Sequence, residues 1–158
     1  MGAITFNTGV DLTTLFIQGS DGSRYSFSNT PTSASTGNLL KYGDDLIVDM
    51  IKQRTLASNG ITLRRSEYQG AKGSFMVGRI NGALEAWSQV QQLGYSAGND
   101  PITYTIHVTI TNRDGSGSIS EYQITNCIVM QSKGPEYAIG QDTSISFDFE
   151  GDYKVIIQ

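Results

Sequence analysis

One stretch of strict alternation constrains this chain more than any other feature. Apolar side chains occupy the even positions from Tyr104 to Ile110, while threonines and His107 occupy the odd positions from Thr103 to Thr111. Successive side chains of a β-strand point to opposite faces, so this segment predicts a strand with one buried and one polar face. The chain must therefore build a sheet that is covered on one side.

The same two-residue period, or strand-forming composition between turn residues, recurs along the chain. It predicts strands at 12–18, 24–28, 61–66, 74–80, 118–131, 143–149 and 153–157. Residues 67–73 are expected to be a loop, and Gly151-Asp152 a turn. In the 118–131 strand, an unbroken period puts Tyr122, Ile124, Ile128 and Met130 on one face.

Two other segments differ from this pattern. Leu84, Trp87 and Val90 follow a helical spacing, which predicts a helix over 83–93 that ends at Gly94. Residues 29–59 are read as a long connection, which is unusual in a small domain unless it has a function. The predicted fold is one mainly β domain over 1–158, an antiparallel sandwich or barrel with one short helix and the long early loop 29–59.

Composition excludes several classes of function. Charged residues make up only 16% of the chain, the net charge is −4, and 17 Ser and 15 Thr supply much of the polarity. A protein that holds nucleic acid by neutralising phosphates needs an excess of Lys and Arg. The sequence contains no apolar run long enough to span a bilayer, and its start lacks a signal-peptide layout, so we expect no membrane anchor.

Residues with catalytic potential are few. The chain has one His, His107, and one Cys, Cys127, which argues against a zinc site and an internal disulfide. We interpret His107 as a polar-face residue and Cys127 as a small core residue. The acids Asp148, Glu150 and Asp152 are read as a solvated strand end. We therefore predict no enzyme activity, with no catalytic residues, metal site or cofactor.

Charge is unevenly distributed along the sequence. Residues 41–79 carry a balance of +3, whereas residues 80–158 carry −6. Two interpretations remain open, chance clustering on a solvated surface and head-to-tail docking of copies through complementary patches. For docking, the candidate inter-subunit contacts are Asp44, Asp45, Arg54, Arg64 and Arg65.

The layout from Gly60 to Ile157 resembles the tail tube proteins of contractile-tailed bacteriophages, whose relatives by fold include tube proteins of phage-like particles and type VI secretion. The resemblance rests on four segments: 60–65, the strand 73–80 leading into the Trp87 helix, the hairpin 104–110 with 122–129, and the closing strand 144–151.

The resemblance implies a structural virion protein of the tail, made in the host bacterial cytoplasm, that forms hexameric rings stacked around a channel. It implies that loop 29–59 reaches an adjacent ring, that DNA passes without specific binding, and that sheath, baseplate and tape-measure proteins are partners. The lumen-facing strand is left unknown. The alternatives are a type VI or phage-like-particle tube subunit and, from another class, a small carbohydrate-binding β-sandwich.

Overall fold

The computed structural model describes residues 6–54 and 60–157, which form eight strands, one α-helix and a short 3-10 helix. In chain order these are η1 (Gly9–Asp11), β1 (Leu12–Gly19), β2 (Arg24–Ser28), β3 (Gly37–Arg54), β4 (Thr62–Arg79), α1 (Ala83–Ser96), β5 (Tyr104–Thr111), β6 (Ile119–Lys133), β7 (Ser144–Gly151) and β8 (Tyr153–Ile156). The expected mainly β architecture with one helix is confirmed.

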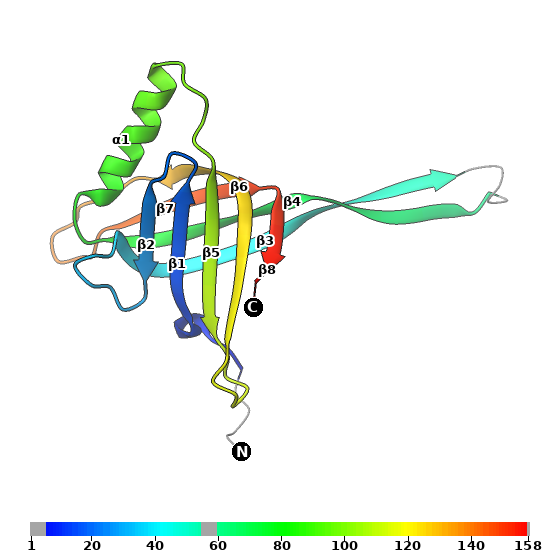
Figure 1. Cartoon of the computed structure of the whole chain (residues 1–158), viewed down its shortest axis with the longest axis horizontal. Coiled ribbons are helices and arrows are strands. Elements are labelled where there is room, and N and C mark those ends of the chain that lie inside the picture. The colour runs from blue at the N-terminus through cyan, green and yellow to red at the C-terminus, as the bar shows by residue number, and fades with distance from the viewer. Residues whose placement is uncertain (1–5, 55–59, 158) are drawn as a thin grey trace.

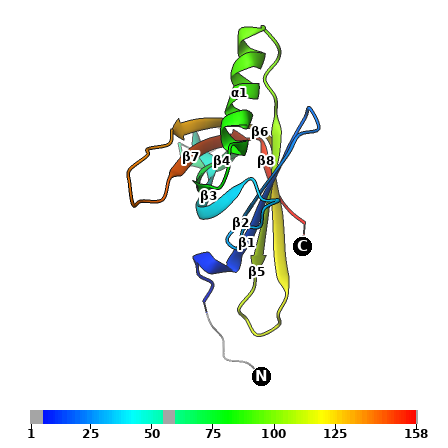
Figure 2. The ribbon, with the colours of Figure 1, turned by 90° about the vertical axis from the view of Figure 1, so that its left-hand side faces the viewer.

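The strands form one sheet that closes on itself. Its order is β5-β1-β2-β3-β4-β7-β6-β8, and β5 also pairs with β6, so a ring of hydrogen-bonded strands is complete. The pairings are antiparallel except for a short parallel step between β2 and β3. In Figure 1, β2, β1, β5 and β6 form a front layer, and β3, β4 and β7 cross behind it. Figure 2 shows these layers from the side, with α1 above them.

An aromatic cluster fills the space between the layers. Trp87 of α1 stacks on Tyr25 at 4.4 Å and on Phe147 at 5.0 Å between ring centroids. Its indole N–H donates to the Tyr104 hydroxyl at 3.0 Å, so the one polar group of the ring is satisfied. Because these partners belong to β2, β7 and β5, the helix fastens the two layers together.

β3 and β4 continue far beyond the closed sheet as a two-stranded arm (Figure 1). We define the arm as residues 46–54 of β3 with their partners 62–71 of β4. At Gly70 the backbone φ is +132°, in a region that favours glycine, and a Cβ here would collide with the Gly151 carbonyl oxygen. Next to it, Gln69 is an extra residue between the pairs Ile47–Gly70 and Val48–Tyr68, so a bulge marks the point where the arm leaves β7.

The predicted loop at 29–59 is wrong over residues 37–54, which form β3, and Thr55–Asn59 lie outside the described residues. The expected strands 61–66 and 74–80 and the loop 67–73 are in fact one strand, β4. Its pairing with β3 along the whole length satisfies backbone groups that the polar and Gly-rich sequence suggested were in loops.

The predicted helix is confirmed, but it does not end at Gly94. It continues to Ser96, where the Ala97 N–H donates to the Leu93 carbonyl and the Gly98 N–H donates to the Tyr95 carbonyl. Leu84 and Trp87 are buried as expected, whereas Val90 is 43% exposed. The buried side chains of the helix therefore lie in its first half.

The predicted phase of β6 fails after Ile124. Asn126 adopts φ +54°, and the β5–β6 register shifts so that Ile124 and Cys127 both point inward. Ile128 and Met130 therefore point outward, with exposures of 40% and 61%. The predicted turn at Gly151-Asp152 is also wrong, because β7 and β8 run in one register along β6 as an interrupted single strand.

Replacing Trp87 by Ala should lower the free energy of unfolding by about 3–5 kcal/mol, since it leaves a cavity in the core and removes the indole hydrogen bond to the Tyr104 hydroxyl. Urea denaturation followed by circular dichroism measures the change. Tyr95→Ala on the same helix is the matched control, because Tyr95 is 88% exposed. Equal effects of the two substitutions would contradict a helix anchored through Trp87.

Candidate functional site

The outer surface of the front layer is built mainly from uncharged polar side chains. The inward residues of the same strands, including Leu15, Phe27 and Val108, are buried, so alternation forces the intervening residues outward. We call this surface the polar face; its members are Thr14, Phe16, Gln18, Arg24, Ser26, Ser28, Thr105, His107, Thr109, Glu121, Gln123 and Thr125. Arg24 and Glu121 cancel in charge, so the face is neutral when His107 is uncharged.

The predicted two-faced strand is thus confirmed in β5. Tyr104, Ile106 and Val108 are buried, and the odd positions lie on the polar face. Cross-strand pairs extend the pattern sideways, because Thr109 lies opposite Thr14 and His107 opposite Phe16.

The polar face includes a shallow hollow of about 370 Å³. Its lining is Gln18, Gly19, Ser20, Thr103, Thr105, His107, Gln123 and Thr125. These groups offer hydroxyls and amides, with His107 as the one titratable side chain in this lining. A nucleophile paired with a base does not arise from this set.

The other candidates for chemistry lie apart from His107. Cys127 is fully buried on the opposite side of the sheet, and burial raises the pKa of its thiol to about 12. Asp148 and Glu150 are exposed on the outer side of β7, while Asp152 accepts a hydrogen bond from Asn126 at 2.7 Å. Among residues 6–54 and 60–157, no three His, Cys, Asp or Glu side chains are grouped to hold a metal.

The arm has two faces of different character. Leu46, Val48, Met50 and Tyr68 share one face with the cations Lys52, Arg54 and Arg64, because cross-strand partners point the same way. We call this the apolar–basic face. The other face is mixed; its members are Ile47, Asp49, Ile51, Gln53, Leu63, Arg65, Glu67 and Gln69.

The five predicted contact residues are divided by this geometry. Arg54 and Arg64 lie on the apolar–basic face, Arg65 lies on the mixed face, and all three are exposed. Asp45 is exposed beside the arm and pairs in register with Lys72. Asp44 is different, because its side chain is only 8% exposed and is occupied within the chain.

Asp44 is the centre of a cluster where the arm joins the body. Its Oδ2 accepts hydrogen bonds from the hydroxyls of Tyr42 at 2.7 Å and Tyr122 at 2.6 Å. The Lys154 ammonium donates to Oδ1 at 2.8 Å and lies 4.1 Å from the centroid of the Tyr122 ring. The cluster thus ties β3 to β6 and β8.

The electrostatics of the cluster favour ionised Asp44. Burial by itself raises the pKa of Asp44, but hydrogen bonds from Lys154, Tyr122 and Tyr42 outweigh it and hold the pKa below its ordinary value. Burial raises the pKa of both phenols, and the Asp44 carboxylate raises it further. The tyrosines therefore remain protonated donors. The sequence does not reveal these partners of Asp44, because Tyr122 and Lys154 lie 78 and 110 residues from it along the chain.

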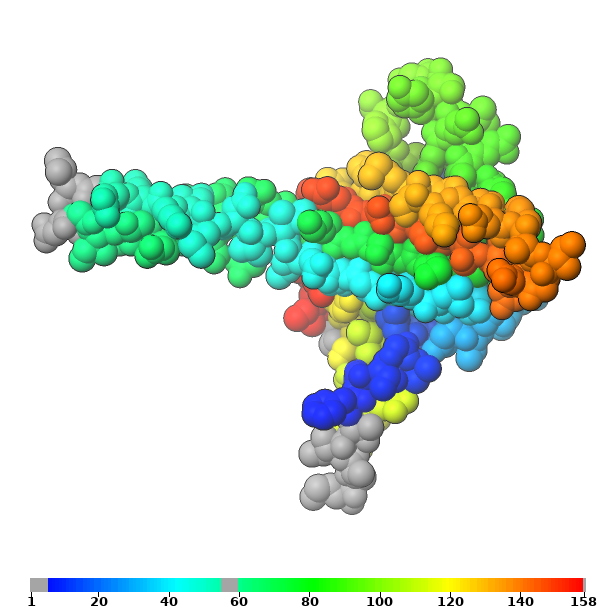
Figure 3. Space-filling view, turned by 180° about the vertical axis from the view of Figure 1, so that it is seen from behind, coloured from blue at the N-terminus to red at the C-terminus, as the bar shows by residue number. Residues whose placement is uncertain are grey.

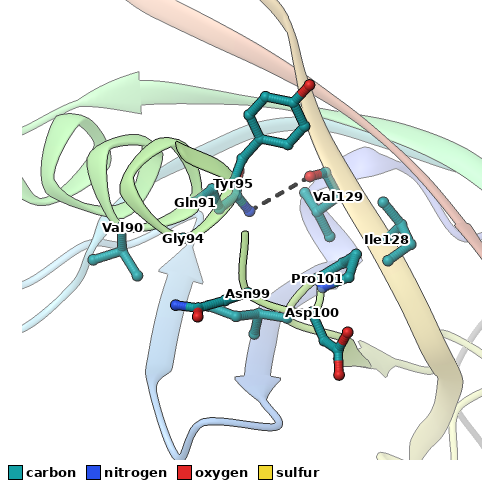
Figure 4. A pocket seen from close by; sticks show the side chains of 10 residues that line it. Val90, Gln91, Gly94, Tyr95, Asn99, Asp100, Pro101, Ile128 and Val129 are labelled. Atoms are coloured by element: carbon teal, nitrogen blue, oxygen red, sulfur yellow. Dashed lines mark hydrogen bonds between the residues drawn. The ribbon is translucent and has the colours of Figure 1, made fainter. Parts of the chain in front are cut away.

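A small groove lies where the end of α1 meets β6 (Figure 4). It has a volume of about 180 Å³ and is lined by Val90, Gln91, Gly94, Tyr95, Asn99, Asp100, Pro101, Ile102, Ile128 and Val129. The Gln91 side-chain amide donates to the Val129 carbonyl at 3.4 Å and fixes one wall. The groove is mainly apolar, with Asp100 as its charged residue.

Comparison with known proteins identifies the fold. No protein-family model and no curated protein sequence matches the chain. Among solved structures, a sheath/tube terminator of the extracellular contractile injection system PVC superposes with a TM-score of 0.62 at 14% identity, covering 99% of this chain and 100% of that one. The cap of the anti-feeding prophage, a tube-terminating cap, gives 0.60 at 12% identity, covering 100% and 95%.

A chain of the PVC sheath-tube complex gives 0.59 at 15% identity, covering 90% of this chain and 87% of that one. The chain has the fold of contractile-injection-system tube and tube-terminator proteins. In the described residues, no helix is long and apolar enough to cross a membrane.

Removing the Asp44 charge by Asp44→Asn should destabilise the fold in a pH-dependent way. The folded-state pKa of Asp44 lies below its ordinary value of 3.8, so its carboxylate stabilises the protein above that pH. This contribution is lost as the pH falls through the lowered folded-state pKa. The difference in free energy of unfolding between the native protein and Asp44→Asn should be constant near neutral pH and shrink below about pH 4.

Urea denaturation at a series of pH values measures this difference. Asp45→Asn is the control, because Asp45 is the adjacent residue and is exposed. A pH-independent difference for Asp44→Asn would show that the carboxylate charge does not hold the cluster together.

Proposed function

We propose that this protein is a tube subunit of a contractile tail or injection particle. Copies form hexameric rings that stack into a hollow tube, and the tube is part of the assembled virion or particle tail. The observation that carries the proposal is a nearly uncharged polar face on one side of a closed sheet of the tube fold, beside an arm that projects into solvent.

The polar face is proposed as the channel lining. Hydroxyl and amide groups stay hydrated without a field of one sign, whereas a row of cations would bind phosphates and hold DNA in place. With Arg24 offset by Glu121, the face suits passage of a large cargo, including a genome, without specific binding. The free edge of β8, which ends the strand order and pairs with β6, would pair with a strand of a neighbouring copy to continue the lining.

The arm is proposed as the principal contact between copies, with Asp45, Arg54, Arg64 and Arg65 at the interface. A lone two-stranded hairpin is marginally stable in water and gains stability from packing against another surface. The Asp44 cluster would set the direction in which the arm leaves the body. Sheath, baseplate and tape-measure proteins are the further partners of such a tube.

A structural role without catalysis is supported by the residues themselves. His107 and Cys127 lie on opposite sides of the sheet, and the Cys127 thiol is buried. A carbohydrate-binding module would present an aromatic platform, but Trp87 is 1% exposed in the core. Tubes of type VI secretion and phage-like particles remain alternatives within the same class of assembly.

A tube-terminating subunit is a second candidate. Two of the superpositions that cover nearly the whole of each chain are with a sheath/tube terminator and a tube-terminating cap; a third is with a chain of the anti-feeding prophage baseplate. A terminator would form a ring at the end of a tube but would not extend it. Self-assembly behaviour separates the two roles.

Electron microscopy of the purified protein at increasing concentration tests both roles. A tube subunit should give rings at low concentration and long hollow tubes at high concentration, whereas a terminator should stop at single rings. Uniform monomers throughout the concentration range would overturn both proposals.

Placing lysines on the polar face tests its role as the lining. Thr105→Lys with Thr109→Lys should preserve assembly but raise the affinity of the assembled rings or tubes for DNA at least about tenfold at low salt, because each copy adds two cations to the channel. Salt-dependent DNA binding measures the effect. Gln89→Lys with Gln92→Lys on exposed positions of α1 is the charge-matched control. Equal gains for both pairs would contradict a lining role.

A further inference from the structure

We propose that the apolar–basic face of the arm binds the outer surface of β6 and β7, next to the end of α1, on a second copy of this chain. The inference rests on the proposed self-assembly and specifies which two surfaces meet. The acceptor surface consists of Val90, Tyr95, Asp100, Ile128, Met130, Asp148 and Glu150.

The apolar–basic face of the arm, which is the donor face of this contact, has the composition of a protein interface although its side chains are exposed. Leu46, Val48, Met50 and Tyr68 are 50%, 45%, 65% and 68% exposed, although they continue the side of β3 and β4 that faces the core in the body. Toward the tip, the same face carries Lys52, Arg54 and Arg64 and no acid. An apolar patch next to a basic patch fits a partner that is apolar and acidic.

The acceptor surface has the complementary composition. The bulge at Asn126 turns Ile128 and Met130 outward on β6, where they lie opposite Glu150 and Asp148 of β7. Asp100 adds a third acid beside the apolar groove at α1. Lys72 lies directly opposite Glu150 and Lys133 lies opposite Ser146, so two cations flank the three acids. Figure 3 shows the outer side of β4, β7 and β6 as a broad surface that no other element covers.

The arm cannot bind the acceptor surface of its own chain, because it points away from the body of that chain (Figure 1). The nine β3 residues from Leu46 to Arg54 extend roughly 30 Å at the rise of a strand, which is enough to cross a neighbouring subunit. Donor and acceptor are different surfaces of one chain, so the contact is heterologous and repeats from copy to copy. The neutral polar face offers neither three acids nor an outward aliphatic pair.

Paired cysteines test the contact directly. A chain with Met50→Cys and Met130→Cys, treated with a short bis-maleimide linker, should give a ladder of cross-linked multimers. Mixing the two single variants should give dimers only. The native Cys127 will not compete, because it is fully buried. Gln53→Cys with Met130→Cys is the matched control, since Gln53 lies on the mixed face of the arm.

Cross-linking read together with electron microscopy separates this inference from the tube proposal. A Met50–Met130 ladder well above the Gln53–Met130 control supports the docking, and supports it even if no tubes form. Tubes without a preferential ladder overturn the docking and leave the tube proposal standing. If neither a cross-linked ladder nor any assembly is observed, both proposals are overturned.

Charge reversal provides an independent readout. Lys52→Glu with Arg64→Glu should weaken self-association at least tenfold, and so should Asp148→Lys with Glu150→Lys. Combining all four substitutions in one chain should restore most of the loss, because the charges are exchanged across the contact. Circular dichroism confirms that each variant is folded. Failure of the fourfold variant to recover association overturns the pairing.

Discussion

Closure of the sheet through β5 is the constraint on which the rest of the structure depends. β5 pairs with β1 on one side and β6 on the other, so the apolar sides of the strands in the body are enclosed around Trp87, Phe75 and Phe147. The intervening side chains are then fixed on the outside by the two-residue period. A neutral surface of hydroxyls and amides is thus a direct result of how the core is closed.

The β3–β4 arm lies outside the closed part of the sheet. Its strands, β3 and β4, have 18 residues each and extend past the closed part of the sheet. Beyond Gly70, no second layer packs against the inner face of these strands. The Asp44 cluster holds the arm where it leaves the body, through charged hydrogen bonds that are shielded from solvent. The body supplies a rigid base, and the exposed apolar side chains of the arm are available to another copy.

Much of this organisation was predictable from sequence, but not uniformly. The alternation in 104–110 and the helical spacing of Leu84 and Trp87 were predicted correctly, because each depends on residues close in sequence. The sequence predicts loops over 37–54 and 67–73, since Gly43, Gly70 and Gly73 look like turn residues until an 18-residue partner strand pairs with them. The shift in β6 was missed because one residue, Asn126, reverses the phase of all that follow it.

The sequence by itself determined that this is a mainly β chain with one polar sheet face, no evident catalytic set and a basic segment followed by an acidic one. These properties follow from composition and local periodicity. Only the tertiary structure decided that Asp44 is held by Tyr42, Tyr122 and Lys154, and that Arg64 and Arg65 lie on opposite faces of an arm. The physical reason is that cross-strand register and an ion pair join residues far apart in the chain, which no local pattern encodes.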